Sequence, residues 1–85
     1  MNIINPTFKP AELEDNGFQL THEAMLDGED YYKTYSLSKN ESELSVTHEY
    51  DAWGDPTAEI IEFNATALKG SKPTWKDLKT LIEIM

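Results

Sequence analysis

Residues 31–50 read YYKTYSLSKNESELSVTHEY, and this stretch decides the fold. Its first part, residues 31–38, is rich in aromatic and Thr residues, as β-strands are. Its last part, residues 42–50, alternates apolar and polar residues with period 2, which places alternate side chains on opposite faces of a strand. Residues 39–41 separate the two parts as a short turn. The stretch therefore predicts an antiparallel β-hairpin.

Two further strands are predicted, one on each side of this hairpin. Residues 18–23 alternate apolar and polar side chains, and a turn at residues 27–30 connects them to the hairpin. After a loop at residues 51–56, residues 59–64 form the fourth strand. Connections this short favour an antiparallel meander over parallel crossovers, which need a dozen or more residues.

Helical signals lie before and after the strands. Pro10 suits a first helical position and Asn16-Gly17 suits a left-handed helix end, so one or two helical turns are predicted between them. Further on, Thr74 with Asp77 three residues later is a variant of the capping box. Apolar side chains then recur at helical spacing: Trp75, Leu78, Leu81, Ile82 and Met85.

The predicted fold is α+β, a four-stranded antiparallel meander with a short N-terminal helix and a C-terminal amphipathic helix packed on one face. Residues 1–85 are expected to form a single compact domain, because the length allows one and no linker interrupts it. The lead-in, residues 1–9, is expected to be extended, with Ile3, Ile4 and Phe8 packing down.

The chain contains 16 acidic and 7 basic residues, a formal net charge of -9, and every basic residue is a lysine. Arginine is the usual bidentate partner of phosphate and guanine, so direct binding of nucleic acid is not expected. Docking on an anionic membrane surface is not expected either. A partner protein with a basic surface fits this charge, since opposite fields speed encounter. The other interpretation is an acidic surface that only raises solubility.

Several kinds of catalytic or metal site are excluded or disfavoured by the sequence. Cysteine is absent, which excludes disulfides, thiolate zinc sites, iron–sulfur clusters and a cysteine nucleophile. Hydrolase and phosphate-loop motifs are absent as well. Glu59 and Glu62 would face opposite sides of a strand, which argues against joint acid–base work. No enzyme activity, cofactor or metal is therefore expected.

The two histidines lie in a repeated Thr-His-Glu triplet, at residues 21–23 and 47–49. Histidine and carboxylate are ligands that zinc or non-haem iron requires, so a metal- or small-ligand-binding protein using His22 and His48 is an alternative. Period-2 geometry opposes it, because His and Glu of one triplet point to opposite faces and another strand separates the triplets. Each histidine is expected at the wet end of a half-buried face.

Aromatic residues near the loops are the candidate anchors for a partner. If Tyr35 and Leu37 pack inward, Tyr32 projects from the other face. Tyr50 ends a strand beside Trp53, and the two either serve as exposed interface anchors or fold over the sheet edge as a second core. The candidate partner-binding site combines the aromatic residues with the acids of two hairpin loops: Tyr32, Tyr50, Trp53, Asp27, Glu29, Asp30, Asp51 and Asp55.

These observations predict a small acidic, non-catalytic protein-interaction domain, an inhibitor or modulator that masks a basic surface of its partner. In charge and size, though in no motif, the chain is similar to small acidic accessory proteins of mobile elements that occupy nucleic-acid-binding sites. A self-associating structural component, such as a virion or accessory component, is a further alternative, with an edge strand pairing with its twin. We expect a monomer or weak homodimer. No apolar stretch has signal-peptide or membrane-span length, so a cytoplasmic location is expected.

Overall fold

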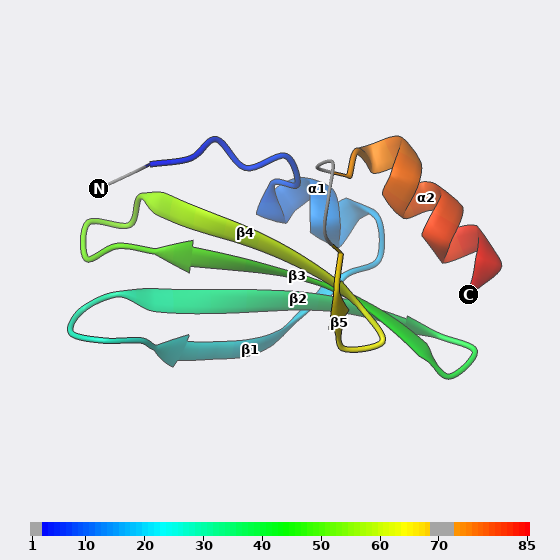
Figure 1. The fold of residues 1–85 in the computed structure, drawn as a ribbon, viewed down its shortest axis with the longest axis horizontal. Helices are drawn as coiled ribbons and strands as arrows, with labels where there is room; N and C mark the ends of the chain where they lie inside the picture. Colours follow the sequence, from blue (N-terminus) through cyan, green and yellow to red (C-terminus); the bar gives the residue numbers. More distant parts are fainter. Residues whose placement is uncertain (1–2, 69–72) are drawn as a thin grey trace.

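The computed structural model describes residues 3–68 and 73–85 and has an α+β architecture (Figure 1). Its elements are, in chain order, α1 (Pro10–Asp15), β1 (Gln19–Met25), β2 (Tyr31–Lys39), β3 (Ser42–Tyr50), β4 (Pro56–Phe63), β5 (Thr66–Ala67) and α2 (Trp75–Ile84). The sheet is antiparallel with the strand order β1-β2-β3-β4-β5, so every strand pairs with its neighbours in sequence. The predicted fold class is confirmed.

Two tight turns fix the register of the meander. Asn40 (φ 51°) and Glu41 (φ 67°) join β2 to β3 with positive φ at both positions, as a type I′ turn requires. Asn64 (φ 49°) and Ala65 (φ 67°) repeat this pattern between β4 and β5. The strand β5 was not predicted, because two residues are too short to show alternation.

Two of the predicted strand ranges need correction. β1 begins one residue later than predicted and continues to Met25, beyond residue 23. β4 begins at Pro56 and not at residue 59, because a proline is tolerated as the first residue of a strand. The longer β4 gives the sheet additional pairing near the β3–β4 loop.

One face of the sheet carries the core, and both helices pack on it; we call it the helix face. β3 directs Leu44, Val46 and His48 to this face, as period 2 predicts, and all three are fully buried. α1 contributes Leu13 and α2 contributes Leu78, also fully buried. The buried apolar cluster consists of Phe8, Leu13, Phe18, Tyr35, Leu44, Val46, Ile61, Leu78 and Met85.

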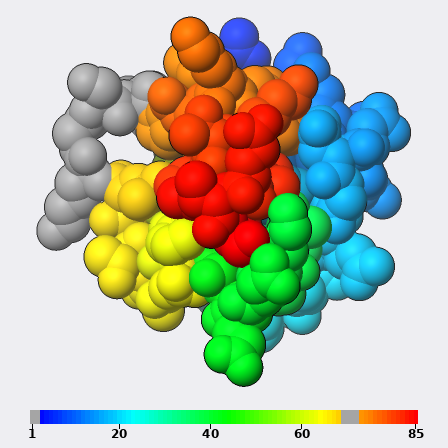
Figure 2. Space-filling view, turned by 90° about the vertical axis from the view of Figure 1, so that its right-hand side faces the viewer, coloured from blue at the N-terminus to red at the C-terminus, as the bar shows by residue number. Residues whose placement is uncertain are grey.

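α2 begins at the predicted capping box and covers one end of the sheet. The Thr74 N–H donates to the Asp77 carboxylate at 2.8 Å, and the Asp77 N–H donates to Thr74 Oγ1 at 3.4 Å. The last residues of α2 pack against the β2–β3 turn (Figure 2), where the Asn40 side-chain amide donates to the Met85 carbonyl at 2.8 Å. Neither helix of the described chain has the length and apolar character needed to cross a membrane.

The lead-in, residues 3–9, runs beside β4 as an extended segment (Figure 1). The Ile4 N–H donates to a β4 carbonyl at 2.9 Å. Phe8 is fully buried and meets Trp75 edge-on, with ring centroids 5.0 Å apart. Ile3 is 61% exposed, so the prediction that it packs down is wrong. The lead-in therefore belongs to the core through Phe8 and not through its first residue.

Candidate functional site

The β1–β2 and β3–β4 loops lie at the same end of the sheet, away from the β2–β3 turn (Figure 1). The register explains this, because Met25 pairs with Tyr31, Tyr31 with Tyr50, and Tyr50 with Pro56, so four strand ends form one row. Tyr31 and Tyr50 stack there, with ring centroids 5.0 Å apart and planes 16° apart. We call this row and its loops the hairpin-end surface: Met25, Leu26, Asp27, Glu29, Asp30, Tyr31, Tyr50, Trp53 and Asp55.

One buried carboxylate holds the β3–β4 loop. Asp51 is 3% exposed, and its Oδ1 accepts hydrogen bonds from the N–H groups of Trp53 (2.9 Å) and Asp55 (3.0 Å). The Gly54 N–H donates to the Asp51 carbonyl at 3.0 Å, and Gly54 has φ +85°, which glycine adopts without strain. Such bonding by an Asp to the backbone two residues on is an Asx-turn. Asp51 therefore fixes the backbone that presents Trp53.

Trp53 is the most exposed large apolar side chain among the described residues, at 80%. Of the two predicted placements, it therefore does not fold over the sheet edge as a second core. Tyr50 is half-buried in its stacked pair, and burial raises its pKa above that of a free tyrosine. Met25 (62% exposed) and Leu26 (41%) add apolar area at the same end of the sheet. Apolar groups gathered at a surface are typical of interaction sites.

Acidic residues concentrate at this end of the molecule. Residues 23–33 and 49–57 contain seven of the sixteen acidic residues but one of the seven lysines. A field of one sign raises the local concentration of an oppositely charged partner. The loop carboxylates that reach solvent belong to Asp27, Glu29, Asp30 and Asp55, whereas that of Asp51 is occupied within the loop.

Tyr32 is the one predicted site residue that lies on the wrong side of the sheet for this surface. It pairs with Glu49, so it lies on the face opposite to Tyr31 and Tyr50. The prediction that Tyr32 projects away from the buried Tyr35 is met, but that same geometry separates it from the other aromatic residues. Tyr32 is therefore not part of the hairpin-end surface.

Three apolar members of the surface were not predicted: Met25, Leu26 and Tyr31. Tyr31 carried a usable signal, because it shares a face with Tyr35 four residues on. Met25 did not, because a β-bulge between Leu20 and His22 breaks the alternation of β1.

The same bulge places the two histidines on opposite faces. His22 pairs with Thr34, on the face away from the helices, and is exposed. His48 lies on the helix face and is fully buried, so the expectation of a wet position is wrong for His48. The structure does not bring the two together. In the described part of the chain, no group of three His, Asp or Glu side chains could hold a metal ion.

His48 is instead bonded to Glu59, whose side chain is only 10% exposed. His48 Nε2 lies 2.8 Å from Glu59 Oε2, and the same carboxylate accepts the N–H groups of Thr7 (3.1 Å) and Phe8 (3.0 Å). Burial alone would raise the pKa of Glu59, but the bonds from His48 and the two backbone N–H groups hold it below its usual value. One carboxylate thus joins β3, β4 and the lead-in.

Acid should weaken the fold partly through this carboxylate. Because the pKa of Glu59 is lower in the folded than in the unfolded chain, its stabilisation is complete above the unfolded value of 4.5 and is lost as pH falls through the folded value. We expect Tm to fall more steeply below about pH 4.5 in the unaltered chain than in Glu59→Gln, measured by calorimetry. Glu62→Gln, on the opposite face, should follow the unaltered chain. Equal slopes for all three would contradict the assignment.

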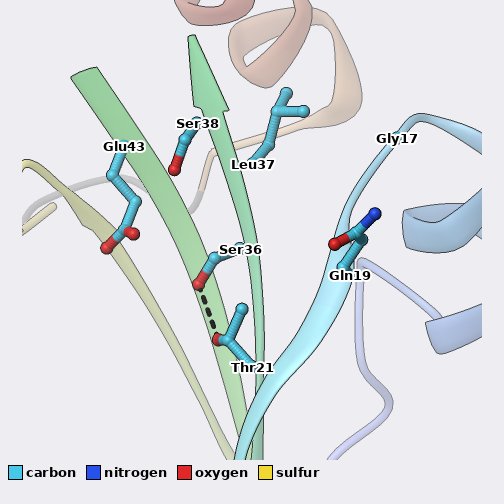
Figure 3. Close-up of a pocket in the computed structure, with 7 residues that line it drawn as sticks. All are labelled: Gly17, Gln19, Thr21, Ser36, Leu37, Ser38 and Glu43. Carbon is cyan, nitrogen blue, oxygen red and sulfur yellow. Dashed lines mark hydrogen bonds between the residues drawn. The ribbon is translucent and has the colours of Figure 1, made fainter. Parts of the chain in front are cut away.

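A hollow of about 260 Å³ extends over β1, β2 and the start of β3 (Figure 3), and it is lined by Gly17, Gln19, Thr21, Ser36, Leu37, Ser38 and Glu43. The hydroxyl groups of Thr21 and Ser36 bond each other at 2.9 Å. Glu43 is the one titratable side chain among the lining residues. Most of the polar groups that line the hollow are hydroxyl and amide groups.

Comparisons of the chain with protein-family models, with curated proteins and with solved structures gave no match. The functional proposal therefore depends on the geometry and charge of the chain's own residues.

Proposed function

We propose that this chain is a small acidic protein-interaction domain that acts without catalysis in the cytoplasm and binds a partner protein through the hairpin-end surface. The observation that carries the proposal is Trp53, 80% exposed on a loop that the Asp51 carboxylate orders. An anchor whose backbone is already fixed loses less conformational entropy on binding than a mobile one. Tryptophan is also among the residues that contribute most at interfaces.

The chemistry of the surface favours a basic partner. Asp27 and Glu29 are exposed in the β1–β2 loop, and Asp55 is partly exposed in the β3–β4 loop, which also carries Trp53. Aromatic faces attract Lys and Arg by cation–π interaction, and carboxylates pair with the same groups. A partner bound here would have its basic surface masked, which is how we propose that the domain inhibits or modulates it.

Trp53→Ala should weaken binding of a partner captured from the native host about 30-fold, the loss of roughly 2 kcal/mol typical of an interface anchor. Circular dichroism should be unchanged, because the exposed indole contributes little to the core. Affinity is measured by calorimetric titration, repeated at raised salt, where binding should weaken because exposed charges are screened.

The matched control is Ile84→Ala, which removes another exposed apolar side chain (71% exposed) from α2, a different part of the molecule. This variant should bind the partner normally. Unchanged affinity in Trp53→Ala, or an equal loss in both variants, would contradict the site assignment.

A further inference from the structure

β1 is an unpaired edge of the sheet. It has β2 on one side, and no strand of the described chain lies on its other side. All seven of its residues are exposed, whereas the strand at the other edge, β5, has two residues. A long exposed edge offers free backbone N–H and C=O groups, to which an extended segment can add as a further strand.

The side chains on β1 define what such a segment must look like. On the helix face β1 presents Leu20 (49% exposed), Glu23 and Met25 (62% exposed), which the bulge brings onto one side. The partners of these three residues on β2 are Tyr35, Lys33 and Tyr31, in the same order. Lys33 Nζ lies 3.5 Å from Glu23 Oε2. The strand that β1 accepts on its paired side is therefore apolar, basic and apolar at alternate positions.

We propose that the free edge of β1 takes an extended segment of the partner protein as an added strand, with a Lys or Arg flanked by apolar residues two positions away on each side. This inference rests on the proposed function and specifies how part of the partner binds. Met25 ends β1 within the hairpin-end surface, so one partner reaches both the edge and Trp53. Charge favours a basic partner over a second copy, because two chains of formal charge -9 repel each other.

The probe is a synthetic peptide with the sequence of residues 31–38, YYKTYSLS, titrated into the full chain beside a peptide in which glutamate replaces its lysine. The lysine peptide should bind at least about fivefold more tightly than the glutamate peptide. Opposite charges that face each other across two strands stabilise the pairing, whereas a glutamate opposite Glu23 would destabilise it. Glu23→Lys should reverse the preference. Glu83→Lys, which makes the same charge change on α2, should preserve it.

Amide hydrogen exchange locates the bound peptide. In β1, the N–H groups directed away from β2 should exchange more slowly when the peptide is bound. Absence of binding, equal affinity for the two peptides, a preference unaltered in Glu23→Lys, or slowing elsewhere without slowing in β1 would overturn the proposal. Concentration-dependent dimers whose β1 amides are protected without peptide would also overturn it, in favour of a second copy.

The test of the added strand can fail independently of the test of the hairpin-end surface. Trp53 lies outside β1, so Trp53→Ala should bind the peptide like the unaltered chain while it binds the captured partner weakly. Failure of the peptide with a persisting Trp53 effect rejects the added strand alone. Peptide binding with no Trp53 effect rejects the hairpin-end assignment instead.

Discussion

Glu59→Ala is expected to lower the free energy of unfolding by about 3 kcal/mol, because three hydrogen bonds to a carboxylate that is only 10% exposed are lost. The variant leaves the buried His48 ring and the N–H groups of Thr7 and Phe8 without their acceptor. The desolvation cost of about 1 kcal/mol or more applies to the buried His48 ring and the partly buried Phe8 N–H, whereas the Thr7 N–H is exposed. Urea unfolding followed by circular dichroism measures the change.

Glu62→Ala is the matched control, three residues further along the same strand. Glu62 pairs with Ser45, so it lies on the face away from the helices. Its removal should change stability by no more than about 0.5 kcal/mol, as is usual for surface substitutions. A loss in Glu59→Ala no larger than that of Glu62→Ala would show that the carboxylate does not hold the lead-in.

Phe8→Ala is expected to cost about 3–4 kcal/mol, the usual range for removing a buried aromatic ring. Phe8 is 0% exposed and packs edge-on against Trp75, so its removal opens a cavity between the lead-in and α2. A chain of 85 residues has roughly 4–13 kcal/mol of stability in total, so this variant should lose a large share of it.

Two further variants keep this test decisive if Phe8→Ala fails to fold. Phe8→Leu retains most of the apolar volume and should cost about 1–2 kcal/mol less than Phe8→Ala. Ile3→Ala removes a side chain that is 61% exposed and should be nearly neutral. If calorimetry found the three variants equally stable, the lead-in would not be part of the core.

The sheet and α2 were predictable because their signals are local. The alternation in residues 42–50 defines β3 residue by residue, and Thr74 with Asp77 defines the start of α2. The bulge in β1 was not predictable, because it is defined by the pairing of β1 with β2 and not by the sequence of β1 alone. That one extra residue is why the repeated Thr-His-Glu triplet has its two histidines on opposite faces.

The candidate site was predictable in composition but not in geometry. Trp53 was recognisable as a loop residue beside Tyr50, but its exposure depends on the bonds that Asp51 makes within the loop. The bond between His48 and Glu59 was not foreseen, because it requires the register between β3 and β4. The sequence did contain a signal for this bond, since His48 and Glu59 are each a polar residue on the otherwise apolar face of a strand.

The order of strands in the sheet bears on how the chain folds. Since every strand pairs with its neighbour in sequence, each hairpin closes only a short loop, and short loops cost little entropy and close quickly. The bonds from the lead-in to Glu59 span 51 and 52 residues, so they become favourable only after β4 has joined the sheet. We therefore expect the meander to assemble first by successive local steps and docking of Phe8 and its neighbours to complete the core.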